Sequence, residues 1–137
     1  MKVKDIMSTK VEALLPYNSL RQAARKMSEL NIGSMPVVED GKLLGIITDR
    51  DISVYAIALG YGPQSTEVQQ VMTKEVVTCF DDQDIDEAAQ LMKQQRIRRL
   101  AVLDHDNFLE GFLSVDDIAL ASHDLAGAVL EAATAIH

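Results

Sequence analysis

The chain of 137 residues has no tryptophan, three tyrosines, three phenylalanines, three prolines and one cysteine. A single cysteine, Cys79, excludes an internal disulfide and fits a reducing compartment. No apolar run approaches the roughly 20 residues that a membrane-spanning helix requires. The opening residues, Met1-Lys2-Val3-Lys4-Asp5, contain no apolar segment typical of a signal peptide. We therefore expect a soluble, cytoplasmic protein.

Positive charge is also scarce. Lysine and arginine number 13 against 21 aspartates and glutamates, which gives a net charge of −8. Such a balance argues against a general affinity for nucleic acid or for an anionic membrane. Hydrophobic residues make up 47% and charged residues 25%, as in ordinary globular proteins. The one basic cluster is formed by Lys93, Arg96, Arg98 and Arg99. It could hold an anion.

What the chain does contain is an internal duplication. The stretch Gly45-Ile46-Ile47-Thr48-Asp49-Arg50-Asp51 returns as Gly111-Phe112-Leu113-Ser114-Val115-Asp116-Asp117. Each copy has a glycine, two apolar residues, a small hydroxyl residue, two variable positions and an aspartate. An offset of 65 residues aligns the upstream parts, and an extra residue near 104–107 makes it 66. We therefore expect a first repeat at residues 1–60, a linker at 61–67, a second repeat at 68–122 and a C-terminal helix at 123–137.

The hydrophobic pattern in each repeat predicts the order strand, helix, strand, strand, helix, so the expected fold class is α+β. In the first repeat, residues 3–12 are expected to form an entry segment and a short strand. Ser19 with Gln22 fits a capping box before the first helix, and Asp84 with Glu87 takes the same place in the second repeat. The two repeats should pack pseudo-symmetrically through their sheets.

Turn signals complete this assignment. Asp40-Gly41 predicts a tight β-hairpin. Thr48 should cap a helix that ends at Gly60, and Ser114 should cap its counterpart. The last segment, 124–137, has few charges and many small apolar residues. It could be a helix folded back on the core or a dimer contact, and the pattern slightly favours the dimer contact.

Two interpretations apply to the paired motifs Thr48 with Asp51 and Ser114 with Asp117. A hydroxyl followed three residues later by a carboxylate is a capping-box start, which benefits any helix. A helix N-terminus with free N–H groups is also an anion site, and a carboxylate one turn later can accept hydrogen bonds from both hydroxyls of a ribose. Two intact copies favour ligand binding over capping alone.

Arg98 and Arg99 precede a predicted strand, where side chains alternate, so at most one of them should point into a given cleft. The planar guanidinium group suits phosphate. Equally, both arginines could simply face water. No nucleophile with an adjacent base, no metal-ligand spacing and no glycine-rich phosphate loop is present in the sequence. We therefore expect a non-catalytic protein without a metal site.

The repeat order and its closing motif resemble a tandem pair of CBS domains, a Bateman module, over residues 1–122. Residues 97–118 are similar to the nucleotide-binding repeats of the regulatory γ subunit of AMP-activated protein kinase. The resemblance implies that Asp51 and Asp117 bind ribose beside Thr48 and Ser114, and that Arg98 and Arg99 meet phosphate. The adenine slots it implies consist of Val11, Met35 and Pro36, and of Val76, Thr78 and Leu100.

The two repeats differ at these places. Ala101 stands where the first repeat has Pro36, and Gly33 and Ser34 stand where the second repeat has two arginines. The sites should therefore be unequal, and the stronger one should involve Arg98 or Arg99.

The resemblance implies a stand-alone regulatory sensor of AMP, ADP or ATP. It would have no other cofactor, form a homodimer and act on an unidentified protein partner. The alternatives are a ligand-free interaction scaffold, in which the motifs are only caps, or a module that binds S-adenosylmethionine, NAD or a metal ion.

Overall fold

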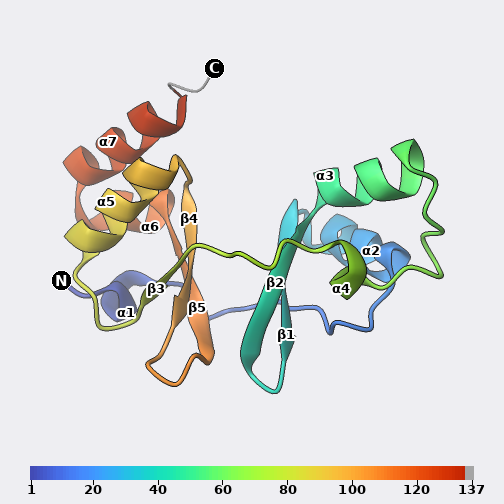
Figure 1. Ribbon diagram of the computed structural model, residues 1–137. Helices are drawn as coiled ribbons and strands as arrows, with labels where there is room; N and C mark the ends of the chain where they lie inside the picture. Colours follow the sequence, from blue (N-terminus) through green and yellow to red (C-terminus); the bar gives the residue numbers. More distant parts are fainter. Residues whose placement is uncertain (135–137) are drawn as a thin grey trace. The chain divides into compact units, whose positions relative to one another are not determined.

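The computed structural model describes residues 1–134, which form two compact units (Figure 1). Unit 1 combines Met1–Val11 with the chain from Val77 onward, and unit 2 is Glu12–Val76. The boundaries of these units therefore differ from those of the sequence repeats, because each unit takes its leading segment from the other repeat. None of the helices within residues 1–134 is long and apolar enough to cross a membrane.

Unit 2 is a two-stranded antiparallel sheet with helices on it. Its elements are α2 (Leu20–Leu30), β1 (Ser34–Glu39), β2 (Lys42–Thr48), α3 (Asp49–Ile52), the π-helix η1 (Ser53–Ala58) and α4 (Val68–Val71). Asp40 and Gly41 have φ angles of 53° and 79°, so the predicted tight hairpin between β1 and β2 is confirmed. In place of a first strand, Leu14 makes a single parallel bridge to Val37.

Helix α2 begins where the sequence predicts. Ser19 Oγ accepts a hydrogen bond from Gln22 N, and the Gln22 side chain reaches back to Ser19 N, so the capping box is confirmed. Asn31 ends the helix in the left-handed conformation, with φ of 54°. The face of the helix that carries Leu20 and Met27 is buried in the core of unit 2.

Unit 1 contains a three-stranded sheet in the order β3-β4-β5, in which β3 is parallel to β4 and β5 is antiparallel to β4. Its elements are α1 (Val3–Ile6), β3 (Thr78–Phe80), α5 (Ile85–Gln95), β4 (Arg99–Leu103), β5 (Leu109–Ser114), α6 (Val115–Ala121) and α7 (His123–Thr134). Helix α7 packs on both α5 and α6 and buries Ala126 and Val129, so the C-terminal helix is part of this core. Positions 135–137 of the expected helix lie outside the described residues.

Three local predictions need correction. Residues 3–12 form no strand, because Val3–Ile6 is a short helix and Ser8 makes only an isolated bridge to Phe112. Asp84 does cap α5, by accepting from Asp86 N, but Glu87 accepts instead from the Gln83 side chain, so no capping box forms there.

The helix that Thr48 caps is α-helical only through Ile52. It continues as the π-helix η1, which ends at Ala58, two residues before Gly60.

The leading segments of the two repeats are exchanged. Lys2 bridges Asp84 at the start of α5, and the equivalent Glu67 bridges Ser19 at the start of α2. Each segment then runs beside the second strand of the hairpin, where Ser8 bridges Phe112 and Thr73 bridges Ile46. Each compact unit is therefore built from residues of both repeats.

Candidate functional site

The repeated motif forms the same hydrogen-bonded structure in both units. Thr48 Oγ1 accepts from Asp51 N at 3.1 Å, and Thr48 N donates to Asp51 Oδ2 at 2.9 Å. Ser114 and Asp117 repeat these contacts at 3.1 Å and 2.9 Å. The predicted caps are confirmed as complete capping boxes. Since a carboxylate offers about four acceptor positions, each aspartate retains capacity for a ligand hydroxyl.

The hairpin strands hold each motif in place. Gly33 O accepts from Asp49 N and Arg98 O accepts from Val115 N, both at 2.9 Å, so the residue before the first hairpin strand is tied to the first turn of the helix. In the ladders, Ser34 pairs with Thr48 and Arg99 pairs with Ser114. Directly paired residues share a face of a sheet. Of the two arginines predicted to bind phosphate, Arg99 is therefore the one on the same sheet face as the cap hydroxyl of Ser114. The equivalent residue beside Thr48 in unit 2 is the uncharged Ser34.

A second contact holds Arg99 on this face. Its guanidinium carbon lies 4.9 Å from the centre of the Phe112 ring, a cation–π distance. Ala101 pairs with Phe112 across the ladder, and Thr78 pairs with Ala101 from the parallel strand. These residues form one strip on the sheet, with Thr78 near one end and the Ser114 cap at the other. Phe112 is not among the site residues predicted from the sequence. The hairpin register, which pairs Phe112 with Ala101, places it on the same face as Arg99 and would have identified it.

Asp117 borders a cavity of about 340 Å³ within unit 1. Beyond Asp117, its lining residues are Met1, Asp5, Ile6, Leu120 and Ala121. Asp5 Oδ2 accepts from Lys2 N at 2.8 Å, so this carboxylate fixes the start of α1. No sequence signal points to these lining residues, because the N-terminal segment reaches α6 only through tertiary packing. The lining contains two carboxylates and no basic side chain, so it suits a group that donates hydrogen bonds, such as a diol.

The residues expected in the adenine slots fall into two groups. Met35 and Leu100 are each 1% exposed and belong to the two cores, so only their main chains could reach a ligand. Pro36 is also buried, and its carbonyl accepts from Leu14 N. The partly exposed residues are Val11 and Thr78 in unit 1 and Val76 in unit 2.

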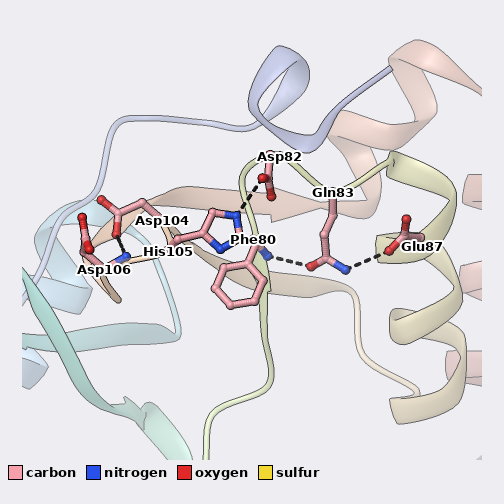
Figure 2. Close-up of polar contacts among 7 residues, drawn as sticks. All are labelled: Phe80, Asp82, Gln83, Glu87, Asp104, His105 and Asp106. Atoms are coloured by element: carbon pink, nitrogen blue, oxygen red, sulfur yellow. Dashed lines mark hydrogen bonds and ion pairs between the residues drawn. The ribbon is translucent and has the colours of Figure 1, made fainter.

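A separate polar network joins the turn after β3 to the β4–β5 hairpin loop (Figure 2). His105 Nε2 lies 2.7 Å from Asp82 Oδ2, and its ring stacks on Phe80 with 4.5 Å between centres. The hydrogen bond to Asp82 raises the pKa of His105 and lowers the pKa of Asp82. Gln83 bridges Phe80 N and Glu87. Neither this network nor any other group among residues 1–134 places three possible ligands around a metal ion.

Comparisons with known proteins identify the family of this chain. The family model for the CBS domain matches twice, at residues 3–57 and 68–124. This chain belongs to the CBS-domain family. The two matches coincide with the duplication, so each capping box lies within a CBS domain.

Several CBS-domain proteins cover nearly the same length. The chain is 40% identical over 130 residues to the CBS domain-containing protein YhcV of Bacillus subtilis, with 93% of this chain and 91% of YhcV aligned.

Among solved structures, the CBS domain pair of MJ0100, in complex with 5-methylthioadenosine and S-adenosyl-L-methionine, is 30% identical with a TM-score of 0.72. The alignment covers 88% of this chain and 94% of MJ0100. CBSX2 in complex with AMP is 25% identical with a TM-score of 0.76, over 90% and 97% of the two chains. The α+β fold with two CBS repeats is thereby confirmed.

Proposed function

We propose that this protein is a non-catalytic regulatory module that binds an adenine nucleotide, AMP, ADP or ATP. The observation that carries the proposal is the strip in unit 1 that joins Arg99 to the Ser114–Asp117 box. Asp117 would accept from the ribose hydroxyls, and Arg99 would donate to phosphate. The adenosyl ligands named for MJ0100 and CBSX2 support this ligand class.

The Thr48–Asp51 box in unit 2 would be the weaker site. Its hydroxyl and carboxylate have the same hydrogen bonds as those in unit 1. The paired strand position, however, is Ser34 rather than an arginine. We therefore expect a nucleotide to occupy the Asp117 site before the Asp51 site. A ligand without phosphate, such as S-adenosylmethionine, should bind the two sites with more similar affinity. A homodimer and a regulated protein partner belong to the same proposal.

One observation favours a second candidate, a ligand-free interaction scaffold. Both capping boxes are complete within the protein, so they stabilise their helices without any ligand. In that case, removing either carboxylate would lower stability and change no binding.

Thermal unfolding with 1 mM AMP, ADP, ATP, S-adenosylmethionine or NAD distinguishes the two candidates. A ligand at a hundred times its Kd adds about 2.7 kcal/mol to the free energy of unfolding. We expect adenine nucleotides to stabilise the wild type and Asp51→Asn, and to have a much smaller effect on Asp117→Asn. The amide oxygen of asparagine can still accept from Ser114 N, which preserves the cap.

Asp116→Asn is the matched control, because Asp116 is an exposed neighbour in the same helical turn and takes no part in the box. Arg99→Gln should weaken nucleotides more than S-adenosylmethionine. If no compound shifts the wild type, the sensor proposal fails and the motifs act only as caps. If Asp116→Asn and Asp117→Asn lose the shift equally, the assignment of Asp117 as the ribose ligand fails.

A further inference from the structure

Three residues of the leading segment, Met1, Asp5 and Ile6, line the cavity at Asp117. We call these three residues the N-terminal wall. Val3 is the one buried residue among positions 1–6, so burial of side chains does not by itself fix the wall. Backbone contacts with the turn between β3 and α5, residues 81–84, hold it instead. The hydrogen bonds are Val3 N to Gln83 O and Lys4 N to Asp81 O, each 2.9 Å, and Ile85 N to Met1 O, 3.0 Å.

His105 of the β4–β5 loop contacts this turn through its ring (Figure 2). Its Nε2 lies 2.7 Å from Asp82 Oδ2, and the ring stacks on Phe80, the residue before the turn. Gln83 is bonded through its side chain and its amide to the backbone of Phe80. His105 therefore contacts two residues, Asp82 and Phe80, on which the position of the Gln83 carbonyl depends.

Unit 2 has the same arrangement with different chemistry. Residues 16–19 correspond to 81–84, and the segment that docks on them repeats the three backbone hydrogen bonds. These are Val68 N to Asn18 O at 2.8 Å, Gln69 N to Pro16 O at 3.3 Å and Leu20 N to Thr66 O at 3.0 Å. In the place of Asp82, Tyr17 donates to Glu39 of the hairpin. That bond and the neighbouring carboxylates raise the pKa of Tyr17 above its ordinary value of 10, so its hydroxyl stays protonated near neutral pH.

Unit 1 instead uses a histidine, the side chain whose charge changes near neutral pH. The charged groups around its contact are Asp81 and Asp82 in the turn, Asp84 and Glu87 at the start of α5, Asp104 and Asp106 in the loop, Glu110 on β5 and Lys2 in the leading segment. The hydrogen bond to Asp82 raises the pKa of His105, and Asp81 and Asp104 add to this. The imidazolium binds the Asp82 carboxylate more strongly than the neutral ring does.

We propose that His105 and Asp82 form a pH-sensitive latch that positions the N-terminal wall of the Asp117 cavity. Protonated His105 fixes the turn, so the wall is in place before a ligand enters. Neutral His105 keeps the ring stack but loses the ionic contact, and part of the ordering of the wall then accompanies binding. Both are positioning residues, because neither lines the cavity. The latch deepens the proposed function by adding pH as an input, and it rests on that function for the identity of the ligand.

Amide hydrogen exchange tests the latch without any ligand. The protection factor of the Val3 amide should fall about twofold to fivefold between pH 6 and 8.5, with the midpoint of the His105 titration. The equivalent Val68 amide should keep a constant protection factor. His105→Gln should have the lower Val3 protection at both pH values. The controls are His123→Gln, which removes another exposed histidine of unit 1, and Glu110→Gln, and both should retain the pH dependence.

Adenosine tests the effect on the site, because it carries the ribose and has no phosphate that titrates in this range. The protein is Asp51→Asn, which confines binding to the Asp117 site. Its Kd for adenosine, measured by calorimetry, should rise about twofold to fivefold between pH 6 and 8.5. Adding His105→Gln should give the higher Kd at both pH values. Because coupling is reciprocal, adenosine should also raise the His105 midpoint in NMR spectra.

The outcomes separate the latch from the sensor proposal. Equal Val3 protection in the wild type and His105→Gln overturns the latch, and so does loss of the pH dependence in Glu110→Gln. Adenosine binding whose pH dependence survives in His105→Gln also overturns the latch and leaves the sensor proposal intact. If Val3 protection follows His105 and neither adenosine nor any nucleotide binds, only the sensor proposal fails.

Discussion

The glycine of the repeated motif has a steric role that can be tested directly. An ideal Cβ on Gly111 would lie 2.3 Å from the carbonyl oxygen of Ser8, far inside van der Waals contact. Ser8 and Phe112 exchange two backbone hydrogen bonds there, of 2.8 and 2.9 Å. Gly111→Ala must therefore push the leading segment away from β5.

The expected cost follows from these contacts. Two backbone hydrogen bonds contribute roughly 1–3 kcal/mol net. The reduced entropy of the unfolded chain returns about 0.4–1 kcal/mol when glycine becomes alanine. We expect Gly111→Ala to lower the free energy of unfolding by about 1–2 kcal/mol, measured by urea denaturation followed by circular dichroism.

Gly127→Ala is the matched control. An added Cβ there has no atom within 4 Å, and the residue lies inside α7, so the change should stabilise by about 0.5–1 kcal/mol. A Gly111→Ala protein as stable as the wild type, with the same denaturant slope, would refute the steric argument.

Two further predictions concern single titrating groups. His105 should titrate in NMR spectra above its ordinary pKa of 6.5, and Asp82→Asn should return the midpoint toward that value. The raised pKa means that the stability due to this pair is complete below about pH 6.5 and is lost as pH rises through the folded-state pKa of His105. Because the pKa of Asp82 is lowered, the stability due to the pair is also lost as pH falls through the folded-state pKa of Asp82. An unchanged His105 midpoint in Asp82→Asn would contradict the assignment of this contact. Burial raises the pKa of the Cys79 thiol to about 11 and leaves the residue 3% exposed. A thiol reagent at pH 8 should therefore react only after unfolding, and rapid reaction of the folded protein would contradict this.

Local chemistry explains what the sequence could predict. The Ser19, Thr48 and Ser114 caps and the Asp40-Gly41 turn depend on residues within three or four positions of one another, and all four form as predicted. Asp84 shows the limit of such patterns. Its partner Glu87 is held by Gln83, which also accepts from Phe80 N, so a competing side chain changes the cap.

Long-range packing explains what the sequence could not predict. The short helix Val3–Ile6 forms where its segment docks on the start of α5, with Val3 N donating to Gln83 O at 2.9 Å. Nothing near Val3 in the sequence encodes that partner. The cavity beside Asp117 follows from the same docking, since Met1 and Ile6 line it. The motif pointed to Asp117 correctly as a cap, but its surroundings depend on a segment more than a hundred residues away.

The exchange of leading segments also explains why the two motifs cannot be treated as independent copies. Gly45 and Gly111 each admit a crossing segment from the other repeat, at Thr73 and Ser8. In unit 1 that segment supplies Met1, Asp5 and Ile6 to the cavity at Asp117. A ligand held by the second repeat's aspartate would thus contact residues of the first repeat. Because the exchange is reciprocal, each motif lies in a unit built from residues of both repeats, and neither repeat supplies a complete unit by itself.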